Sequence, residues 1–129
     1  MTRKTMRFVF DEALDLVEAL FDACELRTET EVLAWRAEVE RELGRFGRKV
    51  DLLINLDGLI VRPTASRAFG EHRSQVLARF AKRSFRYGGD RLTRTTVFTS
   101  SVLVGADANV FPSREAALAA LLEARREEG

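Results

Sequence analysis

The sequence predicts one α/β domain over residues 1–129, in which about four helices pack on a mixed sheet of four or five strands with an N-terminal antiparallel hairpin. A chain of 129 residues, 46% of them hydrophobic, is long and apolar enough for one domain with one core. Short apolar runs of strand length alternate with longer segments of helical spacing, an order typical of α/β proteins.

The N-terminal segment predicts a strand followed by a turn. Met6 to Phe10 alternates apolar and other residues, as a half-buried strand does, and residues 11–15 can turn the chain. The next segment, Leu16 to Ala23, fits either a second strand or a helix, and its periodicity slightly favours the helix.

A helix is predicted from residue 29 onward. Thr28 and Glu31 have the spacing of a capping box, in which the hydroxyl and the carboxylate each accept a hydrogen bond from a backbone amide. Apolar side chains then recur at helical spacing on one stripe, and glycines end the helix. The stripe consists of Val32, Trp35, Val39, Leu43 and Phe46.

The most apolar segment, Val50 to Leu56, is predicted to be a central strand buried on both faces. Leu59 to Val61 either extends this strand or forms its exit. Pro63 and Thr64 then begin a helix. Its apolar face carries Ala65, Ala68, Phe69, His72, Val76 and Phe80, and its other faces carry Arg67, Glu71, Arg73, Gln75 and Arg79.

The C-terminal third predicts two short strands and a final helix. Arg83 to Tyr87 fits a strand that ends at a glycine turn, and Ala108 to Phe111 fits a second one. Ser113 can cap the last helix, Arg114 to Glu128. Between the two strands, Thr93 to Val104 is rich in β-branched residues but also forms a helical stripe, so both structures remain open.

This order of elements resembles the STAS superfamily, specifically its SpoIIAA-like branch. The resemblance rests on the strand Val50 to Gly58, which ends in a polar residue and glycine. It also rests on Ala108 to Leu121, a short strand followed by a Ser-capped, Ala/Leu-rich helix. It covers nearly the whole chain and implies that Leu16 to Ala23 is a strand and Thr93 to Val104 a helix.

The resemblance also implies a non-catalytic interaction or regulatory module in bacterial signalling, with a kinase or anti-sigma factor as the type of partner. Classical members carry an Asp-Ser-Ser-Gly type motif, phosphorylated at the start of the helix after the central strand. The equivalent stretch here, residues 62–67, lacks that Asp and Gly but has Thr64 and Ser66 as candidate phosphosites. Thr64 also fits a plain helix cap. The expected partner-binding residues are Arg62, Arg67 and Arg73.

A second hypothesis is a small anionic ligand or nucleotide, bound near a glycine turn. Glycines allow backbone amides to converge on an anion, and the helix that follows adds partial positive charge. The alternative interpretation is a plain turn with solvated arginines. The candidate anion-binding residues are Gly88, Gly89, Arg86, Arg91 and Arg94, and the pocket would also include Asn55, Asp57 and Thr64.

The inventory of reactive residues argues against catalysis, a metal site and a cofactor. The chain has one histidine and one cysteine, which excludes an intramolecular disulfide and a site with several histidine ligands. We expect His72 to be partly buried and Cys24 to pack as a small apolar residue. Asp51, Asp57, Asp90 and Asp107 do not have the spacing of a metal loop.

Charge and hydropathy limit the partners. The chain has 21 Lys and Arg against 20 Asp and Glu, which argues against a nucleic-acid binder. Residues 51–111 are nevertheless basic, with nine Lys and Arg against five Asp and Glu. No apolar run is long enough to cross a membrane, so we expect a cytoplasmic protein without membrane insertion. A homodimer is compatible with the sequence.

Asn55 is a polar residue in an apolar strand. We expect its side chain to form hydrogen bonds that hold the next loop in place.

Overall fold

The computed structural model describes residues 5–91, 93–95, 97 and 109–128. It confirms the predicted α/β fold with a mixed sheet and an N-terminal antiparallel hairpin. The elements are β1 (Met6–Asp11), β2 (Leu16–Phe21), β3 (Cys24–Leu26), α1 (Glu29–Gly44), β4 (Val50–Asn55), β5 (Leu59–Val61), α2 (Pro63–Phe80), β6 (Ala81–Tyr87), β7 (Val110–Phe111) and α4 (Arg114–Glu128). Residues 91, 93–95 and 97 are also helical.

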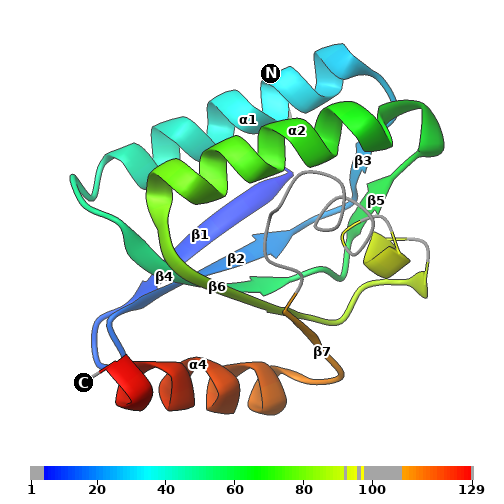
Figure 1. Cartoon of the computed structure of the whole chain (residues 1–129). Helices are drawn as coiled ribbons and strands as arrows, with labels where there is room; N and C mark the ends of the chain where they lie inside the picture. Colours follow the sequence, from blue (N-terminus) through cyan, green and yellow to red (C-terminus); the bar gives the residue numbers. More distant parts are fainter. Residues whose placement is uncertain (1–4, 92, 96, 98–108, 129) are drawn as a thin grey trace.

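The main sheet has the order β1-β2-β4-β6-β7. β1 and β2 form the antiparallel hairpin, and every other neighbouring pair is parallel. Because parallel neighbours need a crossover, α1 connects the hairpin to β4 and α2 connects β4 to β6. Helices α1 and α2 lie side by side over one face of the sheet, and α4 covers the other (Figure 1). Within the described residues, no helix is both long and apolar enough to cross a membrane.

Segment 16–23 forms a strand over most of its length. Its hydrophobic periodicity slightly favoured a helix, and this prediction was wrong, because Leu16–Phe21 is strand β2. Leu16 and Val17 are both completely buried, in core clusters on opposite faces of the sheet. A strand with helices on both faces loses the clean alternation that identifies a half-buried strand.

The predicted caps of the first and last helices are confirmed. The Glu31 amide donates to Thr28 Oγ1 and the Thr28 amide donates to Glu31 Oε1, each at 3.2 Å, which forms the capping box of α1. The Ala116 amide donates to Ser113 Oγ at 3.1 Å at the start of α4. Both caps use local hydrogen bonds that the sequence spacing alone specifies.

The central strand is buried on both faces as predicted. Leu52 belongs to the core under α1 and α2, and Leu53 belongs to the core under α4. Leu59–Val61 does not extend this strand. The chain turns at Gly58, whose φ is +85°, and β5 then pairs with β3 in a separate two-stranded sheet.

The ambiguous segment 93–104 is only partly described. Residues 93–95 and 97 are helical, as the resemblance implies, and the remainder lies outside the described residues. Thr93 is completely buried, and its hydroxyl donates to the Leu59 carbonyl at 2.8 Å. The start of this helical segment is therefore joined to β5.

Candidate functional site

The glycine turn after β6 holds a carboxylate of this chain. Gly88 and Gly89 have φ values of +72° and +83°, and the Gly89 amide donates to Asp57 Oδ1 at 2.8 Å. A Cβ on Gly88 would lie 2.9 Å from the same oxygen. The turn therefore has the backbone geometry expected of an anion site, but Asp57 lies where the anion was expected.

Asn55 supports this arrangement. Its Oδ1 accepts a hydrogen bond from the Asp57 amide at 2.9 Å, which orders the loop after β4. The prediction that Asn55 ties down the next loop is confirmed.

The three arginines predicted near this turn lie in different environments. Arg86 is only 1% exposed and is among the lining residues of an interior cavity. Arg91 and Arg94 are exposed and lie beside Phe111 and Pro112 in a surface groove. The interior position of Arg86 follows from strand alternation, since Ser84 and Arg86 share a face of β6 and the Arg86 Nη2 donates to Ser84 Oγ at 2.6 Å.

The candidate phosphosites at the start of α2 are used within the chain. Thr64 Oγ1 donates to the Arg27 carbonyl at 2.6 Å, and Ser66 Oγ donates to the Pro63 carbonyl at 3.0 Å. The helix cap is Arg62, so the interpretation of Thr64 as the cap was wrong. Thr64 instead joins the start of α2 to the chain just before α1.

The two exposed arginines of this region form ion pairs. Arg62 lies 2.5 Å from Glu25, and Arg67 lies 3.3 Å from Glu71. Both side chains remain at least half exposed. Exposed pairs contribute little to stability and exchange easily, so either arginine can still contact another molecule.

Arg73 was predicted to lie away from the apolar face of α2, and this was wrong. It is 4% exposed and lines the interior cavity. The reason is its spacing, because Phe69, Arg73, Val76 and Phe80 follow the i, i+4, i+7, i+11 series of one helix face and all are buried. This helical series could have predicted the burial of Arg73. It was not used, because charged side chains are usually exposed.

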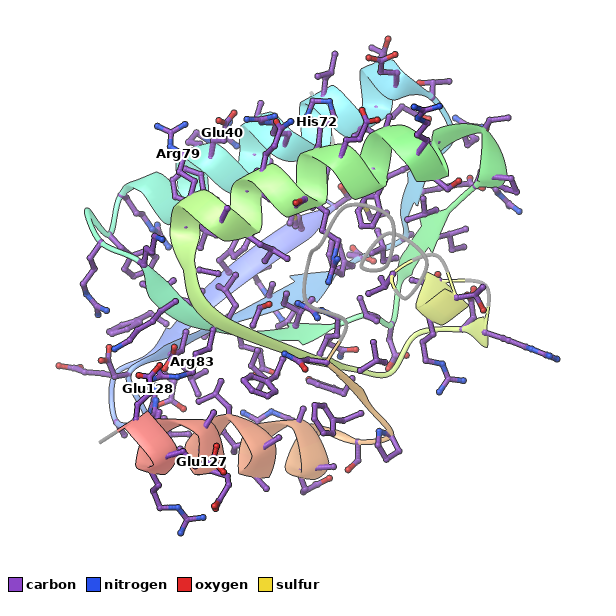
Figure 2. The ribbon with its side chains drawn as sticks, in the orientation of Figure 1. Glu40, His72, Arg79, Arg83, Glu127 and Glu128 are labelled. Atoms are coloured by element: carbon purple, nitrogen blue, oxygen red, sulfur yellow. The ribbon has the colours of Figure 1, made fainter. Side chains whose placement is uncertain are left out.

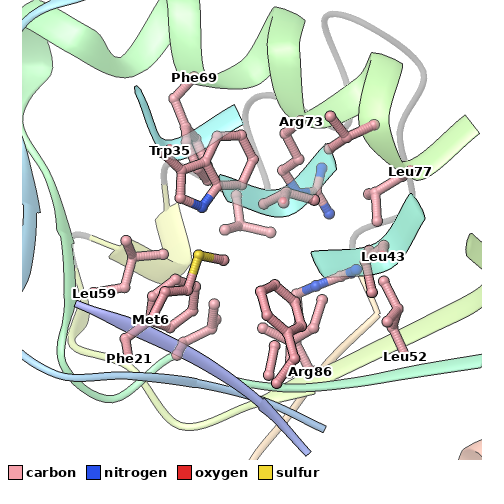
Figure 3. Close-up of a pocket in the computed structure, with 17 residues that line it drawn as sticks. Met6, Phe21, Trp35, Leu43, Leu52, Leu59, Phe69, Arg73, Leu77 and Arg86 are labelled. Atoms are coloured by element: carbon pink, nitrogen blue, oxygen red, sulfur yellow. The ribbon is translucent and has the colours of Figure 1, made fainter. Parts of the chain in front are cut away.

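The cavity that receives Arg73 and Arg86 lies between the sheet and helices α1 and α2. Its volume is about 50 Å³. Figure 3 shows Arg73 of α2 and Arg86 of β6 on one side of the cavity and Trp35 of α1 on the other, next to Phe69. The described lining residues are Met6, Phe8, Ala19, Phe21, Trp35, Val39, Leu43, Leu52, Ile54, Leu56, Leu59, Phe69, Arg73, Val76, Leu77, Arg86 and Val97.

The polar side chains among the described lining residues are Trp35, Arg73 and Arg86, and all three donate hydrogen bonds. Trp35 Nε1 is buried and, among the described residues, has no hydrogen-bond partner. In Figure 3 the indole nitrogen lies on the side of the ring toward Met6, another lining residue. The other two polar side chains are guanidiniums, and none of the described lining residues is Asp or Glu. An indole and a guanidinium can only donate, so the cavity is complementary to an acceptor.

The opposite face of the sheet carries arginines that contact carboxylates. Arg83 lies 2.9 Å and Arg125 2.7 Å from Asp51, which is itself buried. Arg125 also donates to the carbonyls of Leu14 and Asp15, and Arg83 contacts Glu128 near the end of α4 (Figure 2). This cluster attaches the C-terminal end of α4 to the sheet and to the β1–β2 turn.

A second polar cluster attaches the other end of α4. Arg114 makes hydrogen bonds to both carboxylate oxygens of Glu18, and the Tyr87 hydroxyl donates to Glu18 at 2.7 Å. Burial alone would raise the pKa of Glu18, but the hydrogen bonds from Arg114 and Tyr87 outweigh it and hold that pKa below its ordinary value. Burial and the Glu18 carboxylate both raise the pKa of Tyr87. The three groups satisfy one another and fix α4.

His72 and Cys24 take the structural places predicted for them. His72 is half-buried between α1 and α2, where Arg36 Nη1 lies 2.8 Å from its Nδ1 (Figure 2). Cys24 is a buried residue of β3, and burial raises the pKa of its thiol. In the part of the chain that is described, no three metal-binding side chains come together.

Comparisons with known proteins leave the chain without an assigned relative. No family model, curated protein or solved structure matches it. The STAS resemblance therefore stays a prediction.

Proposed function

We propose that this protein is a non-catalytic binding module whose interior cavity holds the carboxylate of a small apolar acid. One observation carries the proposal: the lining of the cavity combines two guanidiniums with a buried Trp35 N–H that has no partner among the described residues, and the rest of the described lining is apolar. This keeps the predicted class of ligand, a small anion, and moves its site from the glycine turn to the cavity.

The chemistry of the lining selects the head group. A carboxylate only accepts hydrogen bonds, and its two oxygens match the planar fork of a guanidinium. A cation would meet Arg73 and Arg86 and be repelled. The leucine and phenylalanine side chains around the head group suit an apolar remainder.

The volume limits the size of the acid. A water molecule needs roughly 10–15 Å³ of such space, so 50 Å³ has room for about four non-hydrogen atoms without rearrangement. Acetate, with four non-hydrogen atoms, fills this space as it stands, and butyrate, with six, also requires the apolar side chains of the lining to move slightly outward.

The test compares butyrate with butyramide, which has nearly the same shape but no charge. Butyrate should raise the melting temperature saturably and change the fluorescence of Trp35, the single tryptophan of the chain, while butyramide should not. At 100 times its Kd, a ligand stabilises the folded state by about 2.7 kcal/mol. Sodium chloride at the same ionic strength is the control for general salt effects.

Two matched variants locate the site. Arg86→Met should reduce butyrate affinity at least tenfold, whereas Arg91→Met, at an exposed arginine, should leave it unchanged. Equal responses to butyrate and butyramide, or equal losses in the two variants, would reject the proposal.

A second candidate function is the STAS-like interaction module, regulated in a bacterial cytoplasm by a kinase or anti-sigma factor. It is supported by Thr64, which is exposed in the first turn of α2 between exposed Arg62 and Arg67, with no acidic residue in that turn. A helix N-terminus and two arginines favour a phosphate there. Protein isolated from its host should then carry an added mass of about 80 Da that Thr64→Ala removes. Protein unmodified under every growth condition would exclude this role.

A further inference from the structure

The outer edge of β1 is an apolar strand edge in the described part of the sheet. β1 is the first strand in the sheet order, so among the described strands it pairs with β2 alone. Of the three large hydrophobic side chains exposed among the described residues, two are consecutive on this strand, Val9 at 45% and Phe10 at 40%. Exposed apolar edge strands favour pairing with another strand.

The backbone geometry shows which groups of β1 face outward. The Asp22 amide donates to the Thr5 carbonyl at 2.8 Å, and the β1–β2 register continues in antiparallel order from Met6 opposite Phe21. Antiparallel pairs alternate between hydrogen-bonded and non-hydrogen-bonded pairs. Arg7, Val9 and Asp11 therefore bond to β2, and the backbone groups of Met6, Phe8 and Phe10 point away from the sheet.

The sequence of β1 complements itself in one register. A second copy related by a two-fold axis must place its outward-facing residues opposite outward-facing residues, which allows axes through Phe8, Val9 or Phe10. An axis at Val9 sets Arg7 of each copy opposite Asp11 of the other, which makes two charge pairs. An axis at Phe8 sets Arg7 opposite Val9, and an axis at Phe10 sets Val9 opposite Asp11.

The apolar side chains agree with the same register. Val9 meets Val9 of the second copy on one face of the sheet. On the other face, Phe10 of each copy lies opposite Phe8 of its partner, close to Phe46, whose ring is 5.5 Å from that of Phe10. The exposed apolar surface of β1 thus becomes cross-strand pairs, which stabilise a sheet.

We propose that two copies of this chain associate through β1, antiparallel about an axis at Val9, so that their sheets become continuous. The interface combines backbone hydrogen bonds from Phe8 and Phe10, the Val9 contact and two Arg7–Asp11 pairs.

Sedimentation analysis of the full chain with two matched variants tests the surface. The wild-type protein and Leu33→Lys should sediment at twice the 14.6 kDa chain mass. Val9→Lys should sediment at the single-chain mass, since it places two positive charges directly opposite each other. Leu33 is the appropriate control because it is equally exposed, at 48%, but lies on α1.

Circular dichroism and melting curves check that both variants fold, which their exposed positions predict. A monomeric wild-type protein at all concentrations, or a Val9→Lys protein that stays dimeric, would overturn the proposal. A partner protein that binds β1 of a monomer would overturn it as well.

Cross-linking tests the register. Residues opposite each other in a non-hydrogen-bonded pair have Cα atoms about 4.5 Å apart, within the range of a disulfide. Val9→Cys should form a disulfide-linked dimer on oxidation, and Phe10→Cys should not, because Phe10 faces Phe8. Cys24 is buried and should not contribute. Cross-linking of Phe10→Cys as efficient as that of Val9→Cys would reject the axis at Val9.

Discussion

The arginines on the two faces of the central sheet have different described neighbours. Under α4, Arg83 and Arg125 contact Asp51, and Arg114 contacts Glu18. Under α1 and α2, Arg73 and Arg86 extend into an apolar cavity that has no carboxylate among its described lining residues.

The difference lies in the described side chains that surround the guanidiniums on each face. Removing a guanidinium from water costs several kcal/mol, and a well-placed carboxylate recovers much of that cost. On the α4 face the carboxylates come from the chain itself, so these clusters fix a helix in place. On the α1/α2 face the described lining around Arg73 and Arg86 is apolar, and our proposal adds the carboxylate of a ligand to it. Butyrate binding to the wild-type protein but not to Arg86→Met would support this half of the comparison.

Removing Asp51 should have the largest effect on the α4 face. Asp51→Ala leaves Arg83 and Arg125 beside an empty position at a buried site, so the free energy of unfolding should fall by about 3–5 kcal/mol. Urea unfolding followed by circular dichroism measures the change.

The control for this variant is Arg48→Ala, which removes an exposed ion pair with Asp15. Exposed pairs are screened by water, so its effect should be much smaller. Similar losses in the two variants would contradict the structural role of the Asp51 cluster.

Glu18→Gln should have an intermediate effect that depends on pH. The pKa of Glu18 is lower in the folded than in the unfolded state, so its stabilisation is complete above the unfolded pKa near 4.5 and disappears as the pH falls through the folded pKa. Near pH 7 the variant should lose about 1–2 kcal/mol, because hydrogen bonds from Tyr87 and Arg114 weaken.

Urea unfolding at several pH values checks this prediction. The difference between wild type and Glu18→Gln should shrink as the pH falls below about 4. A difference that stays constant between pH 7 and pH 3 would show that the charge of Glu18 does not hold α4.

The smallest expected effect is at the helix caps, one on each face. Ser113→Ala removes the cap of α4 and should cost about 1 kcal/mol. Thr28→Ala breaks the capping box of α1 and should cost a similar amount, because capping is local and independent of the face that the helix covers. Thermal unfolding measures both, and a loss several times larger for one cap would show that it also supports tertiary packing.

Most of the fold could be predicted from local patterns. The alternation of Met6 to Phe10, the capping box at Thr28 and the Ser113 cap each depend on residues close in sequence, and the structure confirms all three. Leu16 to Phe21 could not be assigned from periodicity, because its burial is set by helices that are distant in sequence on both faces.

The candidate site was harder to predict than the fold. The sequence pointed to arginines near Gly88 and Gly89, but Asp57 binds that turn from a distant loop. Arg73 was predicted to bind a protein partner and Arg86 to bind an anion at the glycine turn, whereas both are buried and line the cavity. The cavity that they line together with Trp35 depends on three elements, α1, α2 and β6, that only the folded chain brings together.

The sequence alone therefore determined the fold class, the caps of α1 and α4 and the limit of one histidine and one cysteine, because each depends on composition or on spacing within a few turns of chain. The tertiary structure decided where the arginines point. Local pattern sets which face of a helix or strand a side chain occupies. Only the packing of distant elements decides whether that face meets water, a carboxylate of the same chain or a cavity.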